Sequence, residues 1–301
     1  MKVVTGGLGA IGTPLVLKLI ETDDVCIIDN RSTCSYDNYD LLRKCDRHGH
    51  ELLIVEEDTR KLHELDVDFD QMYHLACPGS PSNYTKNPLV TLDICTRGIT
   101  HMIEICKRHK AKLLFVSTSG VYGNAVINPQ HEDYTGNIDI YDQRSCYQEG
   151  NRWAEVVLIN SKIDYSIARL FTTYSKYTSY NDHRVLTEFI SRAKHNEPIL
   201  IHGTGSHTRS FMHVDDAVDG LLKLMESDYS KPVNLGNPYT DISILCLAHK
   251  VINLIRSNSN VIFDDAVLND PTWSRPDITL AKTVLNWEPK IDLDNGIKSI
   301  I

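Results

Sequence analysis

Three residues near the middle of the chain have the types and spacing needed for acid–base chemistry. Thr118 and Ser119 follow a short apolar run, and Tyr147 opens a segment with helical spacing. A tyrosine with a pKa of about 10 can act as a general base when nearby positive charge lowers that pKa. The usual source is a lysine one helical turn on, but that position is Asn151. We expect Tyr147, Thr118 and Ser119 to be the catalytic residues; a buried structural tyrosine is the alternative.

A glycine-rich turn near the start of the chain predicts a dinucleotide site. Gly6, Gly9 and Gly12 follow the apolar run Lys2–Thr5 and open the helical segment Ile11–Ile20. In this pattern the first glycine permits a tight turn, the second admits the pyrophosphate, and the third lets helix and strand pack closely. The helix start then offers N–H groups to phosphate. A purely structural turn is the alternative interpretation.

An acidic residue at the end of the second apolar run favours NAD over NADP. Asp29 can accept hydrogen bonds from the ribose hydroxyls of the adenosine and would repel a 2′-phosphate. Nearby Arg31 weakens this preference, and Asp58 is placed either to reach the adenine or to cap a strand end. The expected cofactor contacts are Gly6, Gly9, Ala10, Ile11, Gly12, Asp29, Asn30, Asp58, Thr59, Leu75, Tyr147 and Asn151.

The elements that must position these residues alternate between strand and helix. Short apolar runs predict strands buried on both faces; they are Lys2–Thr5, Val25–Asp29, Leu52–Val55, Gln71–Leu75, Leu113–Ser117 and Tyr165–Leu170. Helical spacing marks Ile11–Ile20, Pro88–His109, Cys146–Asn160, Arg184–His195 and Asp215–Met225. This alternation predicts an α/β fold with a Rossmann-type doubly wound parallel sheet. We expect an NAD-binding domain over residues 1–171 and a smaller, partly interleaved C-terminal α/β substrate-binding lobe over residues 172–301.

Composition narrows the classes of function. The chain has 301 residues and a net charge of −9, which argues against a nucleic-acid-binding surface. Its apolar runs are too short for a membrane span, and Met1 leads directly into a predicted strand without a signal peptide. The eight cysteines have no metal-type spacing, so we expect reduced thiols, no metal and a cytoplasmic location.

Longer motifs give the chain a specific resemblance over nearly its whole length. Residues 73–81 (YHLACPGSP), 117–123 (STSGVYG), 144–150 (RSCYQEG) and 203–211 (GTGSHTRSF) carry it. They resemble the segments YHLASPASP, STSEVYG, RACYDEG and GSGSQTRAF of the UDP-glucuronic acid decarboxylases (UDP-xylose synthases). These are extended short-chain dehydrogenases/reductases. Residues 233–238 and 276–278 match as well.

The resemblance implies a nucleotide-sugar substrate and a redox-neutral decarboxylation. In that family bound NAD⁺ oxidises the sugar C4 hydroxyl, the β-keto acid loses CO₂, and the NADH formed reduces the ketone to give UDP-xylose. Tyr147 is then the base, Thr118 and Ser119 hold the O4 region, Arg209 neutralises the diphosphate and Tyr84 lies near the sugar carboxylate. The expected substrate contacts are Pro78, Tyr84, Thr172, Arg184, His202, Arg209 and Arg275.

The departures from the family cluster on chemistry. Asn151 replaces the lysine, and Gly120 replaces the glutamate that assists decarboxylation. The other replacements are Cys95 and Thr172 for asparagines, Tyr177 and Ser274 for arginines, and His202 for the uracil-stacking aromatic residue. One acid or base is worth typically about 10²–10⁴ in rate, so turnover is threatened more than folding or cofactor binding.

Three hypotheses follow. One is an NAD-binding UDP-glucuronate decarboxylase with impaired activity. Another is a catalytically silent binding or assembly protein, and the weakest is a related dehydratase or epimerase.

The resemblance also implies a homodimer. Family members pair two long helices from each subunit, which here would be Pro88–His109 and Cys146–Asn160. Ile94, Ile99 and Met102, together with Ile103, either face such a partner or pack inside one subunit.

Overall fold

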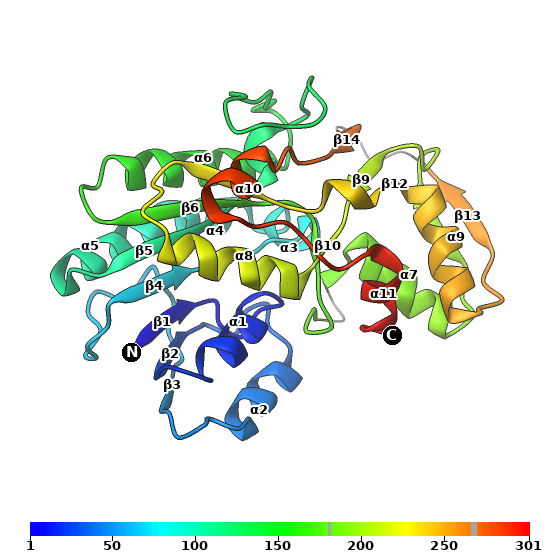
Figure 1. Ribbon diagram of the computed structural model, residues 1–301. Coiled ribbons are helices and arrows are strands. Elements are labelled where there is room, and N and C mark those ends of the chain that lie inside the picture. Colours follow the sequence, from blue (N-terminus) through cyan, green and yellow to red (C-terminus); the bar gives the residue numbers. More distant parts are fainter. Residues whose placement is uncertain (180–181, 266–269) are drawn as a thin grey trace.

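Seven parallel strands form the central sheet (Figure 1). The computed structural model describes residues 1–179, 182–265 and 270–301. In sheet order the strands are β11 (Pro232–Leu235), β6 (Tyr165–Leu170), β5 (Lys112–Thr118), β4 (Gln71–His74), β1 (Lys2–Thr5), β2 (Val25–Ile28) and β3 (Leu52–Val55). The order reverses between β1 and β4, and ligands of open α/β sheets bind outside the strand ends at such a point.

The α/β fold class predicted from the sequence is confirmed, and six of these seven strands lie where the apolar runs predicted them. The seventh strand, β11, comes from beyond residue 171 and pairs with β6, with Val233 opposite Ala168. The sequence contains no apolar run that predicts this strand, because proline and asparagine occupy two of its four positions. Both side chains are accommodated at the sheet edge, where Asn234 donates to the carbonyl oxygens of Gln130 and Asp277.

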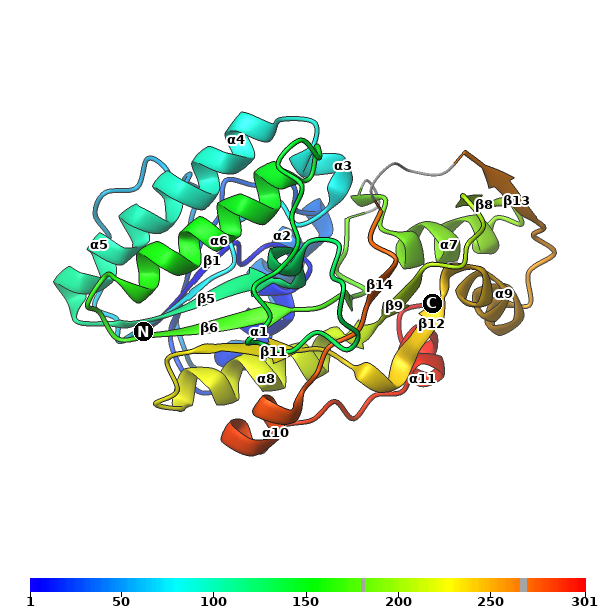
Figure 2. The same ribbon diagram turned by 90° about the horizontal axis from the view of Figure 1, so that it is seen from above.

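Two layers of helices cover the sheet, one on each face (Figures 1 and 2). One layer consists of α1 (Gly12–Leu19), α2 (Tyr36–Lys44), α8 (Val214–Glu226) and α10 (Thr279–Leu285). The other consists of α4 (Pro88–Asp93), α5 (Ile99–His109) and α6 (Ser145–Ile159). Leu15 and Leu221 pack on the first face and Met102 and Leu158 on the second, and all four side chains are fully buried.

A π-helical turn, Ile94–Gly98, interrupts the single long helix expected over Pro88–His109. Such turns insert one extra residue and often occur at functional sites. Gly98 is the last residue of this turn, and glycine is needed there because a Cβ would lie 2.8 Å from the Thr59 hydroxyl oxygen. Ile99 and Met102 are fully buried, and Ile94 and Ile103 nearly so; all four pack inside the subunit rather than facing a partner.

A smaller lobe lies beyond the carboxyl ends of the strands (Figure 2). Its strands are β7 (Thr173–Tyr174), β8 (Ile199–His202), β9 (Thr208–Ser210), β10 (Met212–His213), β12 (Asp241–Ser243), β13 (Val261–Asp264) and β14 (Trp273–Ser274). Its helices are α7 (Val185–Lys194), α9 (Ile244–Ile255) and α11 (Leu293–Lys298), and the short α3 (Pro81–Tyr84) follows β4. Phe189, Phe211 and Leu247 belong to a separate apolar core of this lobe.

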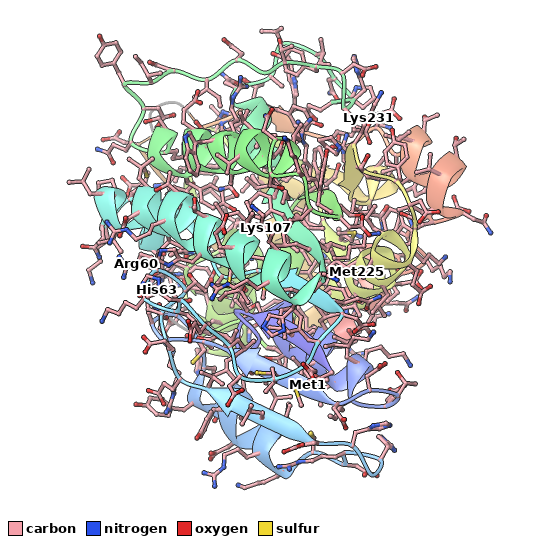
Figure 3. The ribbon with its side chains drawn as sticks, turned by 90° about the vertical axis from the view of Figure 1, so that its left-hand side faces the viewer. Met1, Arg60, His63, Lys107, Met225 and Lys231 are labelled. Carbon is pink, nitrogen blue, oxygen red and sulfur yellow. The ribbon has the colours of Figure 1, made fainter. Side chains whose placement is uncertain are left out.

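At the opposite end of the sheet, where the strands begin, a polar contact joins a strand to a helix. Figure 3 views this end, with Met1, Lys107 and Met225 labelled. Lys112 at the start of β5 donates to the carbonyl oxygen of Met225, 2.8 Å away. Among the described residues, no helix is both long and apolar enough to cross a membrane.

A buried ion pair supports the end of β5 that carries Thr118. Glu155 on α6 accepts from the Ser117 hydroxyl at 2.6 Å and from both nitrogens of the Arg169 guanidinium fork at 2.7 and 3.0 Å. The Glu155 side chain is 6% exposed and that of Arg169 is 13% exposed. Removing one partner of such a pair leaves an uncompensated buried charge.

We therefore expect Glu155→Ala to lower the free energy of unfolding by about 3–5 kcal/mol. Urea unfolding followed by circular dichroism measures the change. Glu104→Ala is the matched control, because Glu104 is exposed on α5 and should change stability by less than about 0.5 kcal/mol. Equal stability of the two variants would contradict this role of Glu155.

Candidate functional site

A cleft of about 640 Å³ lies between the carboxyl ends of the strands and the smaller lobe. Its lining includes most of the expected site residues: Gly6, Gly9, Ala10, Ile11, Gly12, Asp29, Asn30, Asp58, Thr59, Leu75, Pro78, Tyr84, Thr118, Ser119, Tyr147, Thr172, Arg184, His202 and Arg209. Two candidates lie elsewhere. Asn151 is buried inside α6, and Arg275 is exposed with its backbone paired to Gln130.

The glycine turn has the close packing that the motif requires. Gly6 has a φ of +71°, a conformation that favours glycine. A Cβ at Gly12 would lie 2.1 Å from the Gly6 carbonyl oxygen, so only glycine lets α1 begin this close to β1. At Gly9 a Cβ would approach only that same oxygen, at 3.2 Å. The turn therefore presents an uncovered backbone at the start of α1, whose first turn contains no acidic side chain.

Asp29 closes this turn from the end of β2. Its carboxylate accepts from the backbone N–H of Leu8 at 3.1 Å and from that of Arg31 at 2.8 Å. Burial raises the pKa of Asp29, and these backbone hydrogen bonds act in the opposite direction. The Arg31 guanidinium is directed to Glu56 at 3.3 Å and over the Tyr39 ring. The two backbone hydrogen bonds therefore hold the Asp29 carboxylate beside the glycine turn, while the Arg31 guanidinium binds Glu56.

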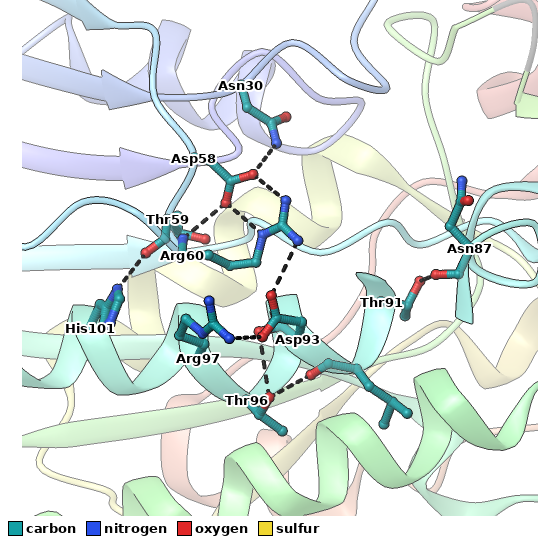
Figure 4. A network of polar contacts seen from close by, with 11 residues as sticks. Asn30, Asp58, Thr59, Arg60, Asn87, Thr91, Asp93, Thr96, Arg97 and His101 are labelled. Atoms are coloured by element: carbon teal, nitrogen blue, oxygen red, sulfur yellow. Dashed lines mark hydrogen bonds and ion pairs between the residues drawn. The ribbon is translucent and has the colours of Figure 1, made fainter. Parts of the chain in front are cut away.

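Asp58 belongs to a polar network between the end of the sheet and the helical segment from α4 to α5 (Figure 4). Its carboxylate accepts from the Arg60 guanidinium at 2.6 and 2.9 Å and from Asn30 at 3.2 Å. Arg60 lowers the pKa of Asp58 well below its usual range. Arg60 also contacts Asp93 on α4 at 3.3 Å. These contacts agree with the capping role, and Asp58 still lines the cleft.

Tyr147 and Tyr84 are brought together from segments far apart in the chain. Their rings stack with centroids 4.7 Å apart and planes 5° from parallel. Burial raises the pKa of the Tyr147 phenol, whereas a hydrogen bond with Thr118 lowers it. The side chains that shift this pKa most are those of Cys77, Thr118, Cys95 and Tyr84, and all four are uncharged in their protonated forms. Tyr147 thus lines the cleft beside Thr118, and burial favours its neutral form.

Two arginines and an aspartate form a charged cluster that the sequence did not reveal as a unit. Asp270 contacts the guanidinium groups of Arg144 and Arg209, each at 3.0 Å. All three residues line the cleft. Arg144 lies three residues before Tyr147, within one of the matched segments, and that placement could have identified it. Asp270 could not be found this way, because only the fold brings it to the two arginines.

Proteins of a known family match this chain over nearly its whole length. Residues 2–236 match the model of the NAD dependent epimerase/dehydratase family. The chain belongs to this family. UDP-glucuronic acid decarboxylase 6 of Arabidopsis thaliana is 40% identical over 300 residues, covering 98% of this chain and 85% of that protein. UDP-glucuronic acid decarboxylase 1 of Danio rerio is 38% identical over 304 residues, covering 99% of this chain and 71% of that protein.

Solved structures of nucleotide-sugar enzymes have the same fold. UDP-glucose 4-epimerase of Thermotoga maritima superposes with a TM-score of 0.88 at 25% identity, covering 99% of this chain and 96% of that one. A UDP-glucuronic acid 4-epimerase of Bacillus cereus, solved with UDP-glucuronic acid and NAD, has a TM-score of 0.86 at 24% identity and covers 99% and 97%. The epimerase/dehydratase family is NAD-dependent.

Asn151 lies one helical turn after Tyr147 on α6 and is buried. Its side chain is 1% exposed, and its amide donates to the backbone carbonyl oxygen of Tyr147 at 2.8 Å. It therefore turns back onto its own helix and not toward the tyrosine hydroxyl. The amide also lies 3.9 Å from the sulfur of Cys95. Asn151 supplies no positive charge to Tyr147.

Gly120 lies close to the ring of the same tyrosine. A Cβ at Gly120 would lie 3.5 Å from the Tyr147 ring and 3.3 Å from Thr118. A side chain at this position would therefore point between the two catalytic candidates, where glycine leaves space. Among the described residues, no three histidine, cysteine or acidic side chains gather as a metal site.

Proposed function

We propose that the protein binds NAD together with UDP-glucuronate and decarboxylates this nucleotide sugar slowly. The observation that carries the proposal is the cleft, which brings the glycine turn, Tyr147 and Arg209 to one place. The identity of 40% to a UDP-glucuronic acid decarboxylase supports the choice of substrate. The replacements Asn151 and Gly120 support the slow rate.

The residues of the cofactor half fit a nicotinamide dinucleotide. The uncovered backbone at Gly9 leaves room for a pyrophosphate, and the N-terminus of α1 favours negative charge. Asp29 is held at the end of β2 and would accept from the ribose hydroxyls. When bound, the cofactor supplies reversible hydride transfer.

The substrate half fits an anionic nucleotide sugar. Arg209 and Arg144 offer two guanidinium groups, and such groups bind phosphate and carboxylate oxygens through paired hydrogen bonds. A diphosphate or a sugar carboxylate would compete with Asp270 for them. Tyr147 would take the proton from a sugar hydroxyl that Thr118 orients, and Tyr84 would pack beside the sugar.

A catalytically silent binding protein is the second candidate. Asn151 favours it, because its uncharged amide donates to the Tyr147 backbone carbonyl and brings no positive charge to the phenol. In this candidate the same cleft retains both ligands, and the bound state serves an interaction or assembly role.

One assay separates the two candidates. Purified protein is incubated with NAD⁺ and UDP-glucuronate, and CO₂ and UDP-xylose are measured; a 4-epimerised sugar acid would be detected in the same chromatogram. UDP-xylose at a low rate supports the decarboxylase. Binding of both ligands in calorimetry without any product would support the silent protein, and absence of NAD binding would refute both.

Preference for NAD should depend on the charge of Asp29. We expect Asp29→Asn to raise affinity for NADP relative to NAD by about tenfold, because a charge near the 2′-phosphate is removed while an acceptor oxygen remains. Calorimetric titration with both dinucleotides measures the ratio. Glu64→Gln is the control, since Glu64 is exposed, pairs with Arg108 and does not line the cleft. An unchanged ratio in Asp29→Asn would contradict this assignment.

The outer faces of α4 and α6 support a homodimer. Five large apolar side chains are exposed there: Leu89, Val90, Trp153, Val156 and Ile159. We call them the α4–α6 face, and Figure 2 shows the two helices side by side in the outer layer. The resemblance to the decarboxylases, in which the corresponding helices pair between subunits, makes a second copy of this chain the proposed occupant.

Charge placed on the α4–α6 face should prevent this association. We expect the double variant Val156→Glu and Ile159→Glu to sediment as a monomer at concentrations where the parent is a dimer, because two carboxylates would be buried at the interface. Analytical ultracentrifugation measures the mass. Val126→Glu is the control, since Val126 is 71% exposed on a loop outside both helices. A monomeric parent would refute the dimer.

A further inference from the structure

Two thiols meet in the wall of the cleft at positions where the resembled family has other residues. The sulfur atoms of Cys77 and Cys95 lie 3.3 Å apart and share a hydrogen bond. Cys77 follows β4 and lines the cleft, whereas Cys95 lies in the π-helical turn and is 3% exposed. Eighteen positions separate the two residues in the chain.

The neighbouring helix is shaped to let these thiols meet. At Gly150 on α6 a Cβ would lie 2.9 Å from the Cβ of Cys95 and 3.1 Å from its sulfur. Glycine therefore lets α6 approach the π-helical turn closely enough to hold Cys95 against Cys77. Asn151 covers the pair from the same helix, 3.9 Å from the Cys95 sulfur.

The third nearby thiol is engaged elsewhere. The Cys146 sulfur donates to the carbonyl oxygens of Gln143 and Tyr84 at 3.4 and 3.6 Å. Cys77 and Cys95 are therefore the two members of the pair; Cys77 is a partly buried residue that lines the cleft, and Cys95 is buried behind it.

We propose that Cys77 and Cys95 are a thiol–disulfide exchange site, in which Cys77 meets a small disulfide from the cleft and Cys95 completes an internal disulfide. The Cys77 thiol loses its proton and attacks one sulfur of a low-molecular-weight disulfide, whose S–S bond breaks and releases one thiol. Cys95 then loses its proton and attacks the sulfur of Cys77, which releases the second thiol. Two protein thiols are oxidised, and the reagent is reduced to two thiols.

The surroundings of the Cys77 thiol determine the rate of this exchange. The hydrogen bond with Cys95, together with burial, raises the pKa of the Cys77 thiol, so this thiol is protonated at neutral pH. The thiolate is the attacking species. Exchange therefore proceeds over minutes to hours.

Peptide mapping after oxidation tests the proposal. The reduced protein is incubated with oxidised glutathione, the remaining thiols are blocked, and the peptides are identified by mass spectrometry. We expect a peptide linked through Cys77 and Cys95, with two free thiols lost at these positions. Glutathione on the exposed Cys246 of α9, without the linked peptide, would overturn the proposal.

Two variants distinguish the order of attack. In Cys95→Ser we expect glutathione to accumulate on Cys77, because the resolving thiol is gone. In Cys77→Ser we expect Cys95 to stay unmodified, because it is buried. Modification of Cys95 in Cys77→Ser at the parental rate would refute access through Cys77. Thermal unfolding of both variants checks that the fold is kept.

A protection experiment links the site to the cleft, and this arm rests on the proposed function. NAD at ten times its Kd should slow formation of the disulfide by about tenfold, because the bound form covers the cleft. NAD binding is measured separately by calorimetry. Failure to bind NAD would refute the proposed function while the linked peptide decides the exchange site; unchanged oxidation with NAD bound would refute access from the cleft.

Discussion

Restoring a lysine at position 151 and a glutamate at position 120 should raise UDP-glucuronate turnover by about 10²–10⁴. The lysine would place a positive charge near the phenol of Tyr147 and so lower its pKa. The glutamate would project from Gly120 between Thr118 and Tyr147, where a Cβ meets its nearest atoms at 3.3 Å. That contact requires a shift of only a few tenths of an ångström.

Room for the lysine is the main structural obstacle. Asn151 is almost fully buried, and its amide already lies 3.9 Å from the Cys95 sulfur. A longer side chain must pass the thiols of Cys77 and Cys95. We therefore expect the fullest gain when Asn151→Lys and Gly120→Glu are combined with Cys77→Ser and Cys95→Asn, which restore the residues of the resembled family.

Release of CO₂ from UDP-glucuronate, measured under single-turnover conditions with NAD⁺, gives the rate. The pH profile provides a second measurement, because activity rises as the phenol of Tyr147 loses its proton, and a lysine that lowers this pKa should move the rising limb from high pH toward neutral pH. Tyr147→Phe in the restored background is the control and should remove the gain. A restored variant that binds both ligands without turnover would refute the decarboxylase proposal.

Replacing Gly9 by alanine should weaken NAD binding on the order of a hundredfold, or about 2.7 kcal/mol, with little change in stability. The Cβ would meet only the Gly6 carbonyl oxygen within the protein, at 3.2 Å. It would, however, stand where the pyrophosphate must approach the backbone. Calorimetry measures binding, and thermal unfolding measures stability.

Gly12→Ala is the contrasting variant for this prediction. A Cβ at Gly12 would lie 2.1 Å from the Gly6 carbonyl oxygen and 2.7 Å from the Cα of Gly7, and both are backbone atoms. We expect Gly12→Ala to lower the melting temperature as well as NAD affinity. Equal NAD affinity of Gly9→Ala and the parent would remove the glycine turn from the proposed cofactor site.

The fold was predictable where its determinants are local. The glycine turn, Asp29 and the apolar runs are each contiguous in the chain, and they predicted six of the sheet strands and the parallel α/β arrangement. Strand β11 was not predictable in this way, because Pro232 and Asn234 give it no apolar run. Its place depends on hydrogen bonds that Asn234 makes with residues far along the chain.

The features of the candidate site also fall into two groups: those that the sequence predicts and those that depend on packing. The sequence by itself determined which residue types are present: a tyrosine at position 147 that is a candidate base, no lysine at position 151 and no carboxylate at position 120. Only the tertiary structure decided how they are arranged. The stack of Tyr84 on Tyr147, the placement of Asp270 between Arg144 and Arg209, and the meeting of Cys77 with Cys95 join residues from separate elements. Side-chain type is fixed by the chain, whereas such contacts depend on how helices and strands pack.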